Sequence, residues 1–258
     1  MDIVALISLI FSFVALIGAF VLEGGVLGAL LEPTAALIVF GGTIGVVCTS
    51  FPAKRLAKVP KLITLVFIKK KENREELMEY FLKLSGIVRK EGLLSLEQEV
   101  SNNSYHDDFL TSGLQLVVDA TDAENLRHAL ETRISSMEER HSKGIAIFEA
   151  AGGYSPTMGV IGTVMGLVHV LGDLSEPDKL GGKIAVAFIA TLYGVGSANL
   201  LWLPIASKLK ELDSDEVVTK YMMLEGILML QNGSNPALIK EHLKGYLENA
   251  KKEETASE

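Results

Sequence analysis

The sequence predicts an all-α, polytopic membrane protein with four transmembrane helices and a helical cytoplasmic domain. Its 258 residues are 48% hydrophobic with a mean hydropathy of +0.32, yet 22% of them are charged. A chain can be both this hydrophobic and this charged if its charged and apolar residues are segregated. Four long apolar runs do alternate with charge-dense blocks. Within those blocks, apolar residues recur at the three-and-four spacing of an amphipathic helix.

Each apolar run is long enough to cross a membrane, since about 20 apolar residues span roughly 30 Å of hydrocarbon. The predicted spans cover residues 3–22, 34–51, 150–168 and 184–206, and none contains Asp, Glu, Lys or Arg. The first run follows Asp2 without a basic segment and is too long for a signal peptide, so we expect a retained span.

Basic residues predict the orientation of the spans. The link between spans one and two holds only Glu23 and Glu32, and the link between spans three and four is mixed (Asp173, Glu176, Asp178, Lys179, Lys183). In contrast, basic residues follow the second and fourth spans: Lys54, Arg55, Lys58, Lys61, Lys69, Lys70, Lys71, Lys208 and Lys210. We therefore expect both termini and the long middle block to lie in the cytoplasm.

Four segments follow from this arrangement. Residues 1–53 form a transmembrane hairpin, and 54–144 a cytoplasmic helical domain. Residues 145–206 form the second hairpin, and 207–258 the C-terminal cytoplasmic helices and tail.

The first cytoplasmic block predicts two helices. Residues 72–100 carry the apolar period, and Gly92 is expected to bend or break that helix. Thr121 and Glu124 match a capping box at the start of the next helix. That helix contains no breaker before Gly144, so it is expected to run into the third span.

The second cytoplasmic block also predicts two helices. The first ends at Gly233 as the residue beyond its C-terminus, and the second starts with Asn235 as N-cap and Pro236 as first residue. The methionines of the first, Met222, Met223 and Met229, are interpreted as core rather than as a plastic binding surface.

Several function classes are disfavoured. A net charge of −8 and a pI near 5.3 argue against nucleic acid as a partner. The sequence has no phosphate-binding loop, no metal-spaced His/Cys cluster and no nucleophile elbow, so we expect neither an enzyme nor a cofactor. Cys48 is the single cysteine and lies in an apolar run, which excludes an internal disulfide.

Small and polar residues distinguish spans two to four from plain membrane anchors. Rows of small residues predict close helix packing: Gly162 with Gly166, then Ala190, Gly194 and Ala198, and Gly41 with Gly45. Pro156 and Pro204 each remove a backbone hydrogen bond and are expected to loosen a turn.

The hydroxyl and amide residues of these spans leave two readings open. Thr163, Thr191, Ser197 and Asn199 either bond back to their own helices or line a wet, ion-accessible path. An ion-coupled protein normally carries an ionisable group at the membrane midplane, and these runs have none. If the chain is coupled to an ion gradient, the carboxylate therefore comes from a partner helix.

Three motifs in order, together with the four-span layout, resemble the A-subunit family of the bacterial flagellar stator (MotA/PomA type), distantly related to ExbB and TolQ. They are "RKEGLLSLEQE" (89–99), "PTMGVIGTVMGLVHVLG" (156–172) and "AVAFIATLYGVGSANLLWLPIASKL" (185–209). The resemblance covers nearly the full length. It implies a subunit of the inner membrane that converts an ion gradient into torque.

The resemblance also implies partners and site residues. Five A-subunits would surround two single-span B-subunits, whose membrane aspartate handles the ion. Pro156 and Pro204 match the family's motif prolines. Arg89 and Glu97, with Lys90 and Glu91 beside them, match its charges that face the rotor switch protein FliG.

The transported ion is expected to be Na⁺, with H⁺ as the alternative. Threonine oxygens suit a dehydrated hard cation, and Thr163, Thr191 and Tyr193 resemble the sodium-driven members. Thr191 occurs in both types, so this preference depends largely on Thr163.

Three other functions remain as alternatives: an ExbB/TolQ-type energiser of outer-membrane processes, a stand-alone channel or transporter, and a structural scaffold. The energisers usually have three spans, so the hairpin of residues 3–51 favours the flagellar branch. The uncharged membrane interior and the lack of an inverted repeat count against a transporter.

Overall fold

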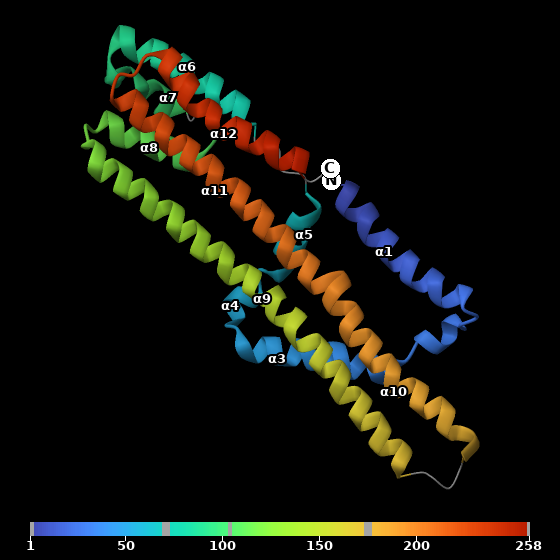
Figure 1. Cartoon of the computed structure of the whole chain (residues 1–258). Coiled ribbons are helices and arrows are strands. Elements are labelled where there is room, and N and C mark those ends of the chain that lie inside the picture. The colour runs from blue at the N-terminus through green and yellow to red at the C-terminus, as the bar shows by residue number, and fades with distance from the viewer. Residues whose placement is uncertain (1–2, 69–72, 103–104, 173–176, 257–258) are drawn as a thin grey trace. The chain divides into compact units, whose positions relative to one another are not determined.

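The computed structural model describes residues 3–68, 73–102, 105–172 and 177–256, and every regular element in these ranges is a helix (Figure 1). The predicted all-α class is therefore confirmed. Five residues used to predict the orientation, Lys69, Lys70, Lys71, Asp173 and Glu176, lie outside the described ranges.

The elements are α1 (Ile3–Leu22), η1 (Leu27–Leu30), α2 (Pro33–Ala36), η2 (Leu37–Gly41), α3 (Gly42–Ser50), α4 (Ala53–Leu56), α5 (Val59–Phe67), α6 (Arg74–Glu91), η3 (Leu93–Ser95), α7 (Leu96–Asn102), α8 (Asp108–Val118), α9 (Ala123–Leu171), α10 (Pro177–Ser197), η4 (Ala198–Trp202), α11 (Leu203–Gln231) and α12 (Pro236–Ala256).

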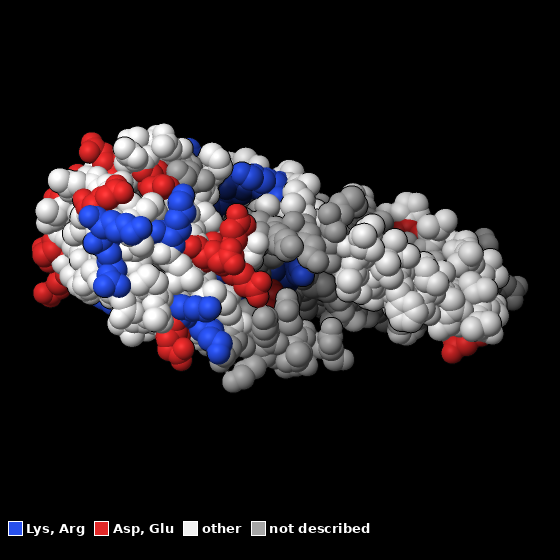
Figure 2. Space-filling model, turned by 90° about the horizontal axis from the view of Figure 1, so that it is seen from above, with Lys and Arg blue, Asp and Glu red and all other residues white. Residues whose placement is uncertain are grey.

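The chain divides into two compact units. We call Met1–Lys69 with His141–Glu211 the membrane unit, and Lys70–Arg140 with Leu212–Glu258 the charged unit. The long helices α9 and α11 contribute residues to both. In Figure 2, Lys, Arg, Asp and Glu side chains gather at the left of the view. The right of the view is mostly free of them and shows only small acidic patches.

Four helical segments are long and apolar enough to cross a membrane, as predicted. They are Ile3–Leu22, Leu27–Ser50, Ala123–Leu171 and Leu180–Gln231. The second is composite, because η1, α2, η2 and α3 follow one another along it. No residue of α1 is buried within this chain, so its apolar side chains need lipid or another subunit to cover them.

The third span continues the charged helix that precedes it without interruption, as predicted, because α9 extends over 49 residues. The expected capping box at its start was wrong by one residue. The carboxylate of Asp122 accepts from the backbone N–H of Asn125 at 3.0 Å. The backbone carbonyl of Thr121 accepts from the side chain of Gln231 of α11.

Small residues let α9 and α10 approach closely. A Cβ atom added at Gly159 would lie 2.8 Å from the carbonyl oxygen of Ala190, and one at Gly162 would lie 2.7 Å from the Cβ of Ala190. The predicted packing is therefore seen between spans three and four. It is not seen for Gly45 of span two, where an added Cβ would meet nothing within 4 Å in this chain.

The two motif prolines differ in their effect on the helix. Pro156 lies inside α9, which continues as regular α-helix through it, so the expected loosening is not seen there. Pro204 lies two residues after the end of η4, a wide π-helical turn over Ala198–Trp202. Since proline cannot donate to the carbonyl four residues earlier, a wide turn at this point has a local cause.

The charged unit has a hydrophobic core of its own, to which α6, α8, α9, α11 and α12 contribute. α6 and α12 lie side by side in it (Figure 1). Phe81, Leu130 and Met222 are fully buried there, and Met223 is nearly so, while Met229 packs against its edge. The interpretation of the methionines as core residues is confirmed.

The predicted helix ends in the charged unit are also observed. Gly92 ends α6 with φ +86°, in the left-handed region that favours glycine. After α11, Gly233 has φ +64°, and the N–H groups of Gly233 and Ser234 donate back to Leu230 and Met229. The side chain of Asn235 accepts from the N–H of Leu238 at the start of α12.

Candidate functional site

The centre of the candidate site is a pair of hydroxyls between spans three and four. The Oγ1 atoms of Thr163 on α9 and Thr191 on α10 lie 2.5 Å apart, and both side chains are half-buried. The Thr163 oxygen also lies 2.9 Å from the carbonyl of Ala187 and 3.1 Å from that of Gly159. The structure therefore brings together the two threonines that the sequence singled out.

The number of protons and lone pairs on the two hydroxyls decides what this pair can bind. A hydroxyl has one proton and two lone pairs. If Thr163 donates to the carbonyl of Ala187 or Gly159, Thr191 must donate the hydrogen bond that joins the two threonines. In the part of the chain that the structure describes, Thr191 then has both lone pairs open to an incoming donor or cation.

A second hydroxyl pair lies further along the same two helices, and it was not predicted. The Oγ atoms of Ser155 and Ser197 lie 2.6 Å apart, and both side chains are buried. Ser197 was noted only as a polar residue of span four, and its pairing with Ser155 depends on the register of α9 against α10. The side-chain amide of Asn199 donates to the carbonyl of Val195 at 2.9 Å. This is the first of the two alternatives, a bond to its own helix.

Tyr193 does not join the threonine pair. Its hydroxyl donates to the carbonyl of Leu30 and accepts from the backbone N–H of Glu32 at 3.2 Å. Its ring lies 6.1 Å from that of Phe40. In this structure, Tyr193 contacts residues at the end of η1 and just before α2, near the start of the second span.

The prolines also lie apart from the hydroxyls. Pro156 is half-buried beside Ser155, and Pro204 is exposed near the C-terminal end of the fourth apolar run. Their side chains offer no polar atom, so any role they have acts through the backbone.

The apolar runs 3–22, 34–51, 150–168 and 184–206 contain no Asp, Glu, Lys or Arg. An ion pair joins Lys210 to Glu149 at 2.5 Å, just outside the ends of two of these runs. No group of three metal-ligating side chains occurs among the described residues. The polar side chains that α9 and α10 bring together within these runs include the two hydroxyl pairs.

The charges expected to face a rotor are exposed and close in sequence. Arg89, Lys90 and Glu91 occupy the last turn of α6, and Glu97 lies in the first turn of α7. Gly92 and the short helix η3 join the two helices. Residues 89–91 and Glu97 therefore lie on either side of one turn of the charged unit, residues 92–95.

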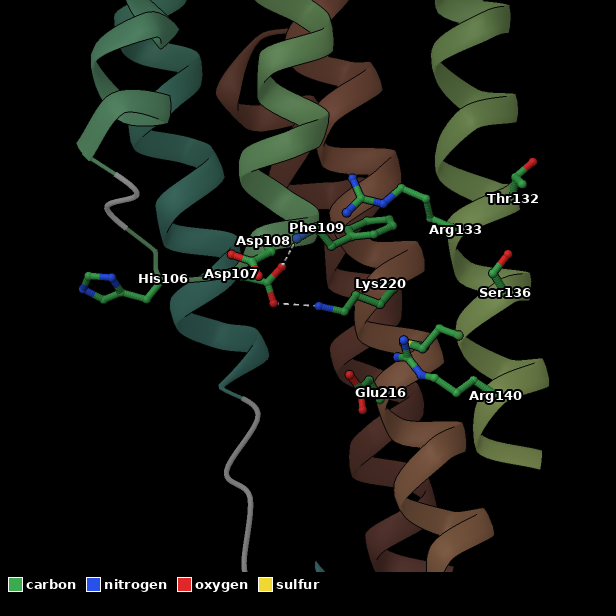
Figure 3. A pocket seen from close by; sticks show the side chains of 11 residues that line it. His106, Asp107, Asp108, Phe109, Thr132, Arg133, Ser136, Arg140, Glu216 and Lys220 are labelled. Carbon is green, nitrogen blue, oxygen red and sulfur yellow. Dashed lines mark hydrogen bonds and ion pairs between the residues drawn. The ribbon is translucent and has the colours of Figure 1, made fainter. Parts of the chain in front are cut away.

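A pocket of about 640 Å³ opens in the same unit at the start of α8 (Figure 3). Lys220 of α11 donates to Asp107 at 2.6 Å, and its ammonium lies 5.4 Å from the ring centre of Phe109. Arg133 of α9 lies over the same ring at 5.8 Å. Basic and acidic groups both line the pocket, so it shows no preference for an anion or a cation.

Asp107 acts at this pocket as a structural residue. Its carboxylate accepts from the backbone N–H groups of Phe109 and Leu110 and so caps α8. Burial alone would raise the pKa of Asp107, but the hydrogen bonds from Lys220 and from the backbone lower that pKa below its usual value.

Comparisons with known proteins agree along the whole chain. Residues 101–223 match the MotA/TolQ/ExbB proton channel family, and residues 6–92 match the Motility protein A N-terminal family. Motility protein A of Bacillus subtilis is 41% identical over 251 residues, which cover 96% of this chain and 91% of that protein. Chemotaxis protein PomA of Vibrio alginolyticus is 36% identical over 252 residues, covering 98% of each. The structure of the flagellar MotAB stator complex from Bacillus subtilis superposes with a TM-score of 0.88 at 40% identity, over 94% of this chain and 95% of that one.

Proposed function

Since the chain belongs to the MotA/TolQ/ExbB proton channel family and is a flagellar stator subunit of the MotA type, we propose that its threonine pair serves the ion path. It is a protein of the inner membrane and not an enzyme. The match of residues 6–92 to the Motility protein A N-terminal family favours the flagellar branch over an outer-membrane energiser.

A MotB-type partner supplies the ionisable group. Similar chains are solved as MotAB complexes, and the partner's single span carries an aspartate opposite Thr163 and Thr191. The observation that carries this proposal is the contact of two hydroxyls in spans without Asp, Glu, Lys or Arg. Such spans can coordinate an ion but cannot exchange a proton by themselves.

Five copies of this chain surround two partner subunits. Apolar side chains that this chain leaves uncovered support an oligomer, including Val160 and Val164 on α9 and Phe188 and Val195 on α10. One charge moving through 100 mV supplies about 2.3 kcal/mol. That energy is enough to shift a packed two-state interface by more than about tenfold per ion.

Both termini and the segments 54–144 and 207–258 lie in the cytoplasm, with the hairpins 1–53 and 145–206 in the membrane. The basic residues after the second and fourth spans support this orientation. Single-cysteine labelling in a Cys48→Ser background tests it. Labelling at position 89 by an impermeant reagent added outside the cell would refute it.

Arg89 and Glu97 act on the rotor switch protein FliG, with Lys90 and Glu91 beside them. Their exposure at the end of α6 and the start of α7 supports a contact role, because exposed charges are accessible to a partner. Rotation of the ring would then carry this turn past the rotor.

Na⁺ is the favoured ion, with H⁺ as the alternative. The open lone pairs of Thr191 and the carbonyl-bonded hydroxyl of Thr163 are oxygen ligands of the kind that a dehydrated Na⁺ needs. The roles of Tyr193, Pro156 and Pro204 are to position spans around this path.

A complementation experiment tests the proposal as a whole. The chain is expressed with its own MotB-type partner in cells that lack a stator, and swimming is measured. Swimming should return with both subunits and with neither alone. Swimming restored by this chain alone would overturn the two-subunit account.

A further inference from the structure

Leu94 is the most exposed large apolar side chain of the charged unit among the residues that the structure describes. It is 70% exposed, compared with 53% for Leu238 and 36% for Tyr221. A single exposed leucine needs no explanation by itself. Its position and its neighbours, however, are unusual.

The turn that carries Leu94 is anchored on both sides. Leu93 packs against the hydrophobic core, and Leu96 is fully buried in it. The hydroxyl of Ser95 donates to the carbonyl of Gly92 at 2.6 Å, and Gly92 adopts a φ of +86°. Leu94 therefore cannot turn inward without breaking these contacts.

The helix after the turn is also held in place. The hydroxyl of Tyr80 on α6 donates to Glu99 on α7 at 2.9 Å, and Lys83 lies 3.6 Å from the same carboxylate. The ring of Tyr80 lies 5.2 Å from that of Tyr105. Burial, together with the hydrogen bond to Glu99, raises the pKa of Tyr80 above its usual value, so the hydroxyl remains a donor to this carboxylate well above physiological pH.

This arrangement resembles the core and rim of a protein interface. Binding surfaces combine a central apolar anchor with a charged, solvent-exposed border. Here Arg89 and Lys90 precede Leu94, and Glu97 follows it, all exposed. The fold holds the apolar side chain outward between charges of both signs before any partner arrives, which lowers the entropy lost on binding.

We propose that Leu94 is the apolar anchor of the surface that contacts the rotor, and that Tyr80 and Glu99 are positioning residues for it. The partner surface is then an apolar depression on the rotor, with an acidic side chain facing Arg89 and a basic one facing Glu97. This inference rests on the proposed function, in which Arg89 and Glu97 contact the rotor.

The test compares substitutions at Leu94 with a matched control. Leu94→Ser, Leu94→Met and Leu238→Ser are each placed in the full chain with its partner. The residence time of fluorescent stators at the motor is measured by photobleaching recovery. Because truncating an interface anchor acts mainly on dissociation, Leu94→Ser should shorten residence at least about fivefold. Leu94→Met and Leu238→Ser should leave it unchanged.

Two further measurements separate the outcomes. Thermal melting of the purified complex should be the same for all three variants, because exposed positions contribute little to stability. A double reversal, Arg89→Glu with Glu97→Arg, is measured in parallel. If that reversal shortens residence and Leu94→Ser does not, the apolar anchor is wrong while the rotor surface stands. If neither shortens it, the rotor surface itself is wrong.

The positioning residues have their own readout. Tyr80→Phe removes only the hydroxyl, so it should speed amide exchange in residues 96–102 and shorten residence to a lesser extent than Leu94→Ser. Unchanged exchange in α7 would overturn the role of Tyr80.

Discussion

The hydroxyl oxygens of Thr163 and Thr191 lie 2.5 Å apart, between two helices that meet through glycine and alanine. The close approach and the hydroxyl contact depend on each other. Without small residues at 159 and 190, the helices would stand further apart and the oxygens would not meet.

Removing the Thr163 hydroxyl should weaken the response to sodium. Thr163→Val keeps the shape of the side chain but deletes an oxygen that contacts Ala187 and Thr191. Loss of one such interaction is worth about 1–3 kcal/mol, so half-maximal swimming speed should need about tenfold more sodium. Thr163→Ser should remain close to the parent.

The sodium series is run at fixed pH with the natural partner. Thr157→Val is the control, because Thr157 is exposed and bonds back to the carbonyl of Tyr154. If the cells swim at full speed in sodium-free buffer and a protonophore stops them, the motor uses H⁺. The two threonine hydroxyls would then serve only helix packing.

Adding a methyl group at the helix contact should destabilise the assembly. In Gly159→Ala, the new Cβ would lie 2.8 Å from a backbone oxygen and 3.1 Å from the Cα of Gly194. Overpacking of this kind costs about 1–3 kcal/mol, which should lower the melting temperature of the purified complex. Gly45→Ala is the matched control within the chain, since nothing lies within 4 Å of its added Cβ. Equal melting of the two variants would contradict the packing argument.

Asp107 should stabilise the charged unit in a pH-dependent way. Its folded pKa is lowered, so its contribution is complete above the unfolded value of about 3.9 and is lost as pH falls through the folded pKa. At pH 7, Asp107→Asn should destabilise the unit by about 2 kcal/mol, because it removes the charged hydrogen bond from Lys220, whereas asparagine caps a helix about as well as aspartate.

The measurement is denaturant unfolding of the complex between pH 7 and pH 3, followed by helical circular dichroism. The difference between parent and Asp107→Asn should shrink below about pH 4. The neighbouring exposed residue provides the control, and Asp108→Asn should show little effect. A difference that stays constant across the range would show that the charge of Asp107 is irrelevant.

Exchanging the charges of Arg89 and Glu97 should impair swimming and leave assembly intact. Both residues are exposed, so the double reversal removes no buried contact. Swimming speed and co-purification of the partner are measured on the same cells. Failure of the complex to form would mean that these charges have a structural role.

Local patterns predicted much of the fold. The apolar runs, Gly92, Gly233 and Asn235 each mark an element that the structure contains, since helix ends and spans depend on residues close in sequence. The helix start was missed by one residue, because Thr121 and the adjacent Asp122 both suit an N-cap and the structure uses the carboxylate of Asp122.

The site was predictable only in part. Thr163 and Thr191 could be singled out as hydroxyls in an apolar run, and the family resemblance added weight to both. Ser155 with Ser197, and Tyr193 with Leu30, are contacts between distant segments that the register of packed helices decides. Ser155 carried no signal apart from its neighbour Pro156.

Ion flux into liposomes tests the central claim most directly. The chain is reconstituted alone, with its MotB-type partner, and with a partner whose proposed membrane aspartate is changed to asparagine. Because the spans carry no Asp, Glu, Lys or Arg, the account predicts gradient-driven flux only with the unaltered partner. Comparable flux from this chain alone, or with the asparagine partner, would contradict it.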